Sequence, residues 1–395
     1  MSRERECIMK KLTLFLTVLG MSALLLTGCN KEEAEAEPEM VVEAIVEGVN
    51  DAETAKAAMA TPTPEPVEEV EEEEVAPEGC YRSELTNEWI SEDIKNQRPI
   101  ACMIDNEKKA LPHYGVNTAD VVYEIMNSTA NDRITRLMAI VKDWKNIERL
   151  GSVRSTRPTN FFLAGEWNAI LIHDGGPFYN DEYYARDYTN NLSGGFARII
   201  NGKATEFTEY VTYDSYTNTQ GKTYDGLGAR IEASKYSPEY NEFYPGAHFT
   251  FNNKDTDINE LSGAIKAENV ELPFYHNGSK LKYNPDTKTY DYYEYGEEHI
   301  DALDDKITSF KNVILQGCSH TQLDENGYLI YNVIGSGTDG YYLTNGYAVP
   351  IAWVKQGETA VTEFKLLTGE NITLNTGKTY IGIVPLDTWG EVVVN

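Results

Sequence analysis

The sequence predicts an α+β (or α/β) N-terminal domain with a largely antiparallel sheet, followed by a small all-β C-terminal domain. Three observations predict this fold class. Residues 79–395 form a stretch of 317 residues, which exceeds one ordinary domain. Apolar runs typical of strands surround one helix-like segment in the first half. From about Thr250 the pattern changes to short alternating runs separated by turn residues. We therefore expect domains at 79–250 and 251–395.

Residues 1–29 have the pattern of a bacterial lipoprotein signal. Basic residues precede an apolar run from Leu12 to Thr27, which is too short to span a bilayer comfortably. The run ends in Leu26-Thr27-Gly28-Cys29, so we expect Cys29 to be lipidated and to become the new N-terminus. An uncleaved anchor with a chance cysteine is the alternative. We expect the mature protein to be held at the outer face of the cell membrane by its lipid alone.

Residues 30–78 are predicted to be a disordered linker. They hold 17 acidic and 2 basic residues, several prolines and no aromatic residue, so they cannot bury enough surface to fold. Repulsion between like charges keeps such a segment extended. The whole chain has a net charge of −29, of which −16 remains for residues 79–395. An acidic domain of this kind argues against nucleic acid as a partner.

The first half contains four expected strands and a helix. The strands are Arg98–Asp105, Ala119–Met126 (where a helix is the alternative), Ile134–Val141 and Asn168–Ile172. Thr156-Arg157-Pro158-Thr159 predicts a helix start, with a hydroxyl group as the cap and proline in the first turn. Asp181–Asp187 is a further expected helix.

The second half is predicted to be a β barrel or sandwich. Leu281–Tyr283 and Tyr290–Tyr295 flank Asn284-Pro285-Asp286 and predict a hairpin. Tight-turn signals occur at Asp339-Gly340 and Asn345-Gly346. Further strands are expected at Asn312–Gln316, Tyr328–Val333 and Tyr380–Val384.

The segment from Asp132 to Pro177 holds the densest set of candidate binding groups. They are Arg133, Arg136, Arg154, Arg157, His173, Asp174, Gly175 and Gly176. Two arginines at a helix N-terminus add positive charge to backbone N–H groups that already favour anions. We therefore expect a site for an anionic ligand that bears phosphate or carboxylate. The alternative is that the arginines pair with Asp120, Glu124 or Asp132 and only hold the domain together.

The sequence gives no positive signal for catalysis, a metal or a cofactor. No serine lies in a nucleophile elbow. His173 and Asp174 could exchange protons, but neighbouring residues on a strand face opposite sides. The three cysteines after Cys29 (Cys80, Cys102 and Cys318) allow at most one disulfide and show no zinc-binding spacing. His299-Ile300-Asp301 offers two possible ligands or an acid/base pair, although a histidine paired within its hairpin is the favoured interpretation.

Several motifs in order resemble the YerB-like bacterial lipoprotein family, a two-domain family of unknown function. They are RPIACMIDN, ADVVYEI, RITRLMAIV, GSVRSTRP and AILIHDGG, followed by GYYLTNGYAVPIAWVK and LNTGKTYIGIVP. The resemblance covers Arg98–Pro385 and implies an anchored, extracytoplasmic protein with no established activity. It marks Arg133, Arg136, Arg154, Arg157, His173, Gly175 and Gly176 in this chain. Asn131-Asp132 departs from the small residues that the family usually has there.

The favoured hypothesis is a non-enzymatic envelope lipoprotein whose first domain binds an anionic envelope ligand or partner through the arginine cluster. The first alternative is a phosphotransferase acting on phosphorylated cell-envelope carriers. Asp132-Arg133 and Ser152-Val153-Arg154 are similar in arrangement to LytR-CpsA-Psr phosphotransferases, which hold a lipid pyrophosphate and a metal, but Ser155 stands where that family has aspartate. The second alternative is a structural interaction module without a small ligand. The oligomeric state stays open.

Overall fold

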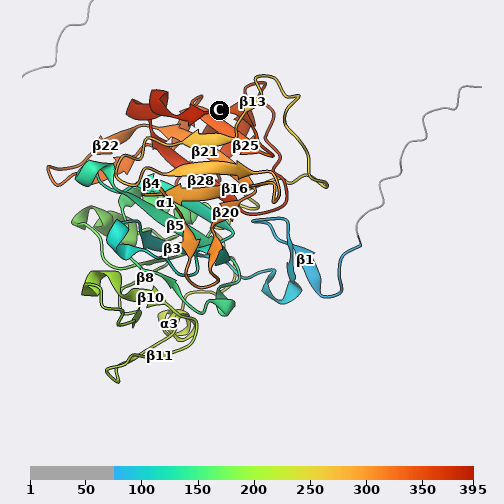
Figure 1. Ribbon diagram of the computed structural model, residues 1–395. Coiled ribbons are helices and arrows are strands. Elements are labelled where there is room, and N and C mark those ends of the chain that lie inside the picture. Colours follow the sequence, from blue (N-terminus) through green and yellow to red (C-terminus); the bar gives the residue numbers. More distant parts are fainter. Residues whose placement is uncertain (1–74) are drawn as a thin grey trace, which may run out of the picture. The chain divides into compact units, whose positions relative to one another are not determined.

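The structure is a computed structural model that describes residues 75–395, which fall within one compact unit (Figure 1). The predicted signal with Cys29, and the linker up to residue 74, lie outside the described residues. No helix among residues 75–395 is long and apolar enough to cross a membrane. Cys80, Cys102 and Cys318 form no disulfide with one another.

A twelve-stranded mixed sheet forms the centre of the molecule. Its main path runs β13-β26-β25-β21-β28-β4-β5-β3-β7-β8, and β24 and β27 pair with β26. The strands are β3 (Ile100–Asp105), β4 (Val121–Met126), β5 (Thr135–Val141), β7 (Ile170–His173), β8 (Asn191–Ser193), β13 (Ile265–Lys266), β21 (Asn312–Cys318), β24 (Gly335–Gly337), β25 (Gly340–Thr344), β26 (Tyr347–Lys355), β27 (Glu363–Leu366) and β28 (Thr379–Pro385).

Strands from the two halves of the sequence pair directly in this sheet. β4 lies parallel to β28, with Val121 opposite Thr379 and Ile125 opposite Ile383. In Figure 1 the teal strands β3, β4 and β5 of the first half lie beside the orange and red strands of the second half, which include β21 and β28. The second half is built of strands as expected, but its sheet extends the first half's sheet. The boundary near residue 250 stays a prediction.

A second sheet of six strands has the order β17-β16-β15-β14-β29, with β20 paired to β16. Its strands are β14 (Asn269–Glu271), β15 (Lys280–Asn284), β16 (Thr289–Glu294), β17 (Glu297–Glu298), β20 (Ser309–Phe310) and β29 (Val393–Val394). The smaller sheets use β1 (Cys80–Arg82), β2 (Trp89–Ser91), β6 (Leu150–Gly151), β9 (Ala197–Arg198), β10 (Glu209–Val211), β11 (Tyr216–Thr217), β12 (Thr223–Tyr224), β18 (Ile300–Asp301), β19 (Lys306–Ile307), β22 (His320–Gln322) and β23 (Leu329–Tyr331).

The described helices are short and lie between strands. The α-helices are α1 (Pro158–Gly165), α2 (Asp181–Tyr184) and α3 (Leu227–Ser234). The 3₁₀ helices are η1 (Glu92–Ile94), η2 (Lys108–Ala110), η3 (Val116–Thr118), η4 (Asn131–Arg133), η5 (Trp144–Asn146), η6 (Phe178–Asn180), η7 (Thr205–Phe207) and η8 (Leu386–Glu391).

Both faces of the central sheet are buried, which explains why its strands are nearly continuous apolar runs. Along β3, Ile100, Cys102 and Ile104 pack into one hydrophobic core. Ala101 and Met103, which point to the opposite face, pack into a second core. Helix α1 covers this second face with Phe161, Phe162 and Leu163. Burial of the apolar groups on both faces is the main favourable term in folding.

Most of the strand predictions are confirmed. The four strands of the first half appear as β3, β4, β5 and β7, and the predicted hairpin is β15–β16. The sheets are largely antiparallel, since only four of the described strand pairs (β3–β7, β7–β8, β21–β28 and β4–β28) are parallel.

Two details of the helix predictions are wrong. Proline is in the first turn of α1, but the cap residue is Arg157 and makes no side-chain cap bond. The Asn160 side chain instead accepts a hydrogen bond from the Arg157 backbone N–H at 2.9 Å, and the Thr156 hydroxyl bonds to the same amide oxygen. The second predicted helix ends at Tyr184 and not at Asp187, because the chain turns there through the Arg186 N–H to Tyr183 C=O bond.

Candidate functional site

Polar residues gather at one edge of the central sheet. β3, β4 and β7 run in the same direction, so their carboxyl ends meet at this edge, and β5 begins there. Asp105 ends β3 directly opposite Arg136 on β5. Asn127 follows β4 without a break. The sheet therefore brings a carboxylate, a guanidinium and an amide to one place.

The segment after β6 crosses this edge and is fixed to it by backbone hydrogen bonds. The Arg154 N–H donates to the carbonyl of Met103, and the Asp174 N–H donates to the carbonyl of Arg154. The Thr156 N–H donates to the carbonyl of Gly175. These bonds join the segment to β3 and to the turn after β7. They fix the backbone positions of Arg154 and Arg157, from which the two side chains extend.

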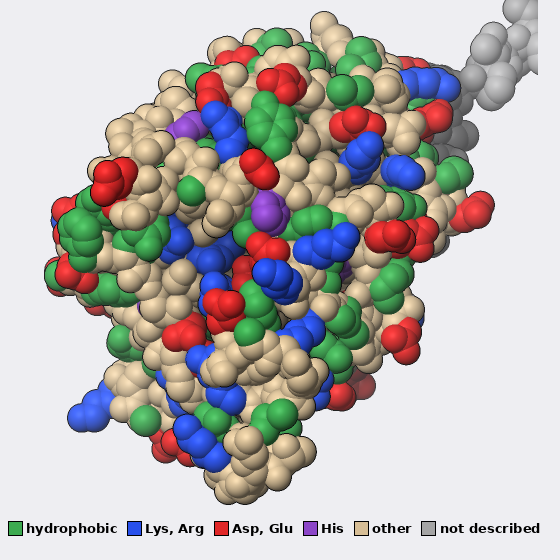
Figure 2. Space-filling view, turned by 60° about the vertical axis from the view of Figure 1, so that its left-hand side comes forward, with side chains coloured by type: hydrophobic (Ala, Val, Ile, Leu, Met, Phe, Trp, Pro, Cys, Tyr) green, Lys and Arg blue, Asp and Glu red, His purple; other side chains and the backbone are tan. Residues whose placement is uncertain are grey.

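Three of the predicted arginines line one cavity of about 350 Å³. Its lining is mostly polar: Asp105, Glu107, Lys109, Asn127, Ser128, Ala130, Asn131, Ile134, Arg136, Arg154, Arg157, Glu206, Phe207, Asn326 and Tyr328. We call this space the arginine cavity. Figure 2 looks onto the side of the molecule that is at the left in Figure 1 and shows basic and acidic side chains gathered around a hollow near its middle.

Arg136 and Arg157 are buried without a carboxylate partner in the described part of the chain. Arg136 is 6% exposed and Arg157 is 8% exposed. Arg136 donates to the Asn127 side chain at 3.0 Å and to the Ser155 carbonyl at 2.6 Å. Arg157 donates to the Asn127 carbonyl at 3.2 Å, and its guanidinium lies 4.8 Å from the centre of the Tyr328 ring. All these partners are neutral.

The electrostatic consequence is a lowered pKa for both guanidinium groups. Burial, together with the neighbouring charges of Arg136 and Arg154, lowers the pKa of Arg157 to about 9. Burial is likewise the main reason why the pKa of Arg136 is lowered to about 10, although the negative charge of Asp105 opposes this shift. Positive groups that are removed from water and placed beside one another favour a negative charge between them.

Arg154 is different because acidic side chains contact it. Its Nε lies 3.0 Å from the Asp105 carboxylate, and its terminal nitrogen lies 3.5 Å from Glu206. Its side chain is 28% exposed. Arg154 therefore forms the more exposed, partly neutralised wall of the arginine cavity.

The other predicted site residues do not line this cavity. Arg133 forms a two-pronged ion pair with Asp387, with contacts of 3.0 and 2.5 Å. His173 is buried, bonded to the Gly175 carbonyl and the Asn191 side chain, and burial lowers its pKa. Asp174 pairs with Arg198 at 2.9 Å.

Gly175 and Gly176 shape the turn after β7. Gly175 has a φ of +74°, which favours glycine, and a Cβ there would meet nothing within 4 Å. A Cβ at Gly176 would clash with the side-chain amide of Asn180. Both glycines are next to the segment that carries the arginines, but neither lines the arginine cavity.

The carboxylates named in the alternatives are bound elsewhere. Asp120 accepts the Lys142 backbone N–H, and Glu124 accepts hydroxyl groups from Thr135, Ser279, Tyr292 and Tyr380. Asp132 is not among the residues that line the arginine cavity. Sequence reasoning missed Asp105, Asn127, Glu206 and Tyr328. The turn character of Asn127 was visible, but no sequence signal connected Tyr328 to residues nearly 200 positions earlier.

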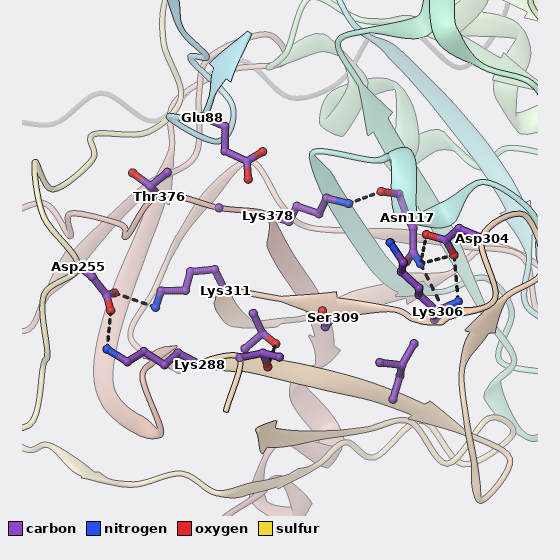
Figure 3. Close-up of a pocket in the computed structure, with 14 residues that line it drawn as sticks. Glu88, Asn117, Asp255, Lys288, Asp304, Lys306, Ser309, Lys311, Thr376 and Lys378 are labelled. Carbon is purple, nitrogen blue, oxygen red and sulfur yellow. Dashed lines mark hydrogen bonds and ion pairs between the residues drawn. The ribbon is translucent and has the colours of Figure 1, made fainter. Parts of the chain in front are cut away.

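Another cavity, of about 590 Å³, lies elsewhere and is lined by several lysines (Figure 3). Lys288 and Lys311 both pair with Asp255, at 3.2 and 2.7 Å, and Lys378 donates to the Asn117 carbonyl. Because Lys288 and Lys311 share a carboxylate partner, this lysine-lined cavity has less need of an anion than the arginine cavity.

Comparison with known proteins places this architecture in a family. The model of the protein of unknown function (DUF3048) N-terminal domain matches residues 85–236, and the model of its C-terminal domain matches residues 270–381. The chain therefore belongs to this two-domain family, whose function is unknown.

A named protein of Bacillus subtilis is similar to this chain in sequence and in structure. The chain is 27% identical over 312 residues to the "Putative lipoprotein YerB" of Bacillus subtilis (strain 168), covering 77% of this chain and 86% of the relative. The crystal structure of the YerB protein from Bacillus subtilis has a TM-score of 0.62 and 21% identity, over 80% of this chain and 99% of that chain. The predicted family is confirmed, and so is the likeness to a protein described as a lipoprotein.

Proposed function

We propose that this protein binds an anionic ligand, through a phosphate or carboxylate group, in the arginine cavity. The observation that carries the proposal is that Arg136 and Arg157 are buried beside each other with no carboxylate partner among residues 75–395. The nearby carboxylate of Asp105 is paired with Arg154, so a ligand anion would supply the negative group in direct contact with Arg136 and Arg157.

Burying the charged guanidinium groups of Arg136 and Arg157 costs free energy. An ion removed from water costs several kcal/mol even after the protein relaxes, and an uncompensated ion keeps that cost. Hydrogen bonds to Asn127, Ser155 and Thr156 reduce the cost but bring no negative charge. Guanidinium groups present a planar set of donors that matches carboxylate and phosphate oxygens.

The cavity also limits which anions fit. Its volume is at the small end of the range for ligand sites, roughly 300–1,000 Å³. Asp105, Glu107 and Glu206 stand in its wall and would repel additional negative charge. We therefore expect a single phosphate or carboxylate group to enter, with the remainder of the ligand extending past Asn326 and Tyr328 toward solvent.

The setting of this activity is the cell envelope. A lipid at Cys29 and the acidic linker would hold the folded part outside the outer face of the membrane. The ligand would then be an envelope component or partner that carries an accessible phosphate or carboxylate.

Thermal unfolding of the purified protein tests the proposal. We expect the unfolding temperature to rise with inorganic phosphate or acetate, compared with sodium chloride at equal ionic strength. The Arg157→Gln variant should remain folded and lose this response. Arg133→Gln is the matched control, because Arg133 belongs to the same segment but pairs with Asp387. An equal response in both variants would refute the assignment.

A further inference from the structure

A second polar cluster lies where the two halves of the chain meet. His113 comes from the first half, and Glu294 and His299 come from the second. One ligand atom from each lies within 4.8 Å of the others, and the residues are 0%, 2% and 3% exposed. His299 belongs to the His-Ile-Asp motif for which a pairing within its own hairpin was expected. It bonds to the nearby Thr308, but it also contacts His113.

The two imidazole rings face each other through one nitrogen each. His113 Nδ1 and His299 Nε2 are 2.8 Å apart. The other nitrogen of each ring is already used: His113 Nε2 lies 2.6 Å from the Asp105 carbonyl, and His299 Nδ1 lies 2.9 Å from the Thr308 hydroxyl. A histidine held in this way has its remaining nitrogen fixed in direction.

The hydrogen bonds of the two rings place no proton between His113 Nδ1 and His299 Nε2. The Asp105 carbonyl only accepts, so His113 Nε2 carries a proton. The Thr308 hydroxyl donates its proton to Asn117, so His299 Nδ1 must also carry one. Two neutral imidazoles then point lone pairs at each other. Either a third proton or a metal ion is needed between them.

A third proton is disfavoured because it creates a buried imidazolium. Both rings are buried, at 0% and 3% exposure, so an imidazolium there would lie away from water. Neutral imidazoles are the form that binds metals.

The third member of the cluster supplies an unpartnered acceptor. Neither Glu294 oxygen has a hydrogen-bond partner among the described residues. Oε1 lies 3.6 Å from His299 Nε2. Asn106 Oδ1 is also a buried acceptor without a partner. A cation bound between the two rings would satisfy the carboxylate of Glu294.

We propose that His113, Glu294 and His299 bind a transition-metal ion, with Zn²⁺ as the first candidate, which joins the two halves of the chain. Two imidazole nitrogens and a carboxylate oxygen are a donor set that zinc accepts. Nitrogens bound to a tetrahedral zinc lie roughly 3.3–3.4 Å apart, so the rings must separate by about half an ångström.

Burial makes this a structural site. The ligands come from a loop after η2, the end of β16 and the position between β17 and β18. Asp301 already links the same halves by accepting the backbone N–H groups of Gly115 and Asn117, both at 2.8 Å. The proposed metal site does not depend on the proposed anion site, so an experiment can refute either proposal without refuting the other.

The test uses the full chain without a histidine tag. After treatment with a chelator and removal of the chelator, the protein is titrated with Zn²⁺ and Co²⁺. We expect about one ion per chain, a rise in unfolding temperature, and a Co²⁺ absorption spectrum typical of tetrahedral coordination. His299→Gln and Glu294→Gln should weaken binding by at least about tenfold. His320→Gln, at a half-buried histidine outside the cluster, should not.

The result on the unmodified protein decides the question even if the variants fail to fold. Absence of stoichiometric binding in the folded wild type would overturn the proposal and would mean that a shared proton lies between the rings. Binding that persists in both variants, or that is lost equally in His320→Gln, would also overturn it. Phosphate binding measured on the same samples separates this outcome from that of the arginine cavity.

Discussion

The side-chain oxygen of Asn127 accepts a hydrogen bond from Arg136 at 3.0 Å, and the main-chain oxygen of Asn127 accepts one from Arg157 at 3.2 Å. One neutral residue therefore holds both buried guanidinium groups at the end of β4. Asn127 is itself buried, at 5% exposure.

This arrangement predicts how stability and phosphate affinity change when the Asn127 amide is replaced by a carboxylate. Asn127→Asp keeps the shape of the side chain but supplies the charge that the two arginines lack. We expect the unfolding temperature of the ligand-free protein to rise and phosphate affinity to fall by about tenfold or more, since hydrogen bonds between charged groups are the stronger ones. Asn326→Asp at the rim of the cavity is the control and should change both quantities less. Tighter phosphate binding in Asn127→Asp would contradict the charge argument.

The pair of Glu209 and Asp174 predicts a pH dependence of stability. Burial, with the hydrogen bond to Asp174 as the next cause, raises the pKa of Glu209 to about 7. Because the folded state holds this proton more tightly than the unfolded state, Glu209 contributes less stability as pH rises from about 4.5 to about 7. The difference in unfolding free energy between wild type and Glu209→Gln should change by up to about 3 kcal/mol over that window. Urea unfolding at several pH values measures it, and a flat difference would contradict the assignment.

The buried ion pair of Lys355 and Glu166 predicts a strong effect of removing one partner. Their charged atoms are 3.0 Å apart, and the side chains are 0% and 1% exposed. Lys355→Met removes the lysine charge beside the Glu166 carboxylate and leaves His248, at 3.5 Å, as its remaining ion-pair partner. The change should cost about 3–5 kcal/mol of unfolding free energy. Glu166→Gln in the same chain should recover part of this loss. Equal stability of the single and double variants would show that the two charges are not coupled.

The pairing of β4 with β28 predicts that the halves do not fold separately. A fragment that ends at residue 250 exposes one side of β4, and a fragment that starts at residue 251 exposes one side of β28. Unpaired strand edges and exposed core are unfavourable. Circular dichroism should show each fragment largely unfolded and a gain of structure when they are mixed. Cooperative unfolding of each isolated fragment would contradict this expectation.

Local pattern made much of the fold predictable. Strands such as Ile100–Asp105 and Thr135–Val141 are short apolar runs bounded by polar turns, and Pro158 marks the first turn of α1. The continuity of the sheet was not predictable, because the pairing of Val121 with Thr379 depends on contacts between residues more than 250 positions apart.

The candidate site was predictable only in part for the same reason. Arg136, Arg154 and Arg157 are brought together as the density of basic groups indicated. Arg133 is removed from the set by Asp387, which lies on η8 near the end of the chain. The local sequence around His299 indicates only a hairpin. It contains no signal for the contact with His113, which lies 186 positions earlier.

Isothermal titration of inorganic phosphate into the purified wild type, Arg157→Gln and Arg133→Gln tests the central claim most directly. We expect one phosphate-binding site in the wild type and in Arg133→Gln, and at least about tenfold weaker binding in Arg157→Gln. Equal affinity in all three proteins, or no binding of phosphate or acetate to the folded wild type, would contradict it.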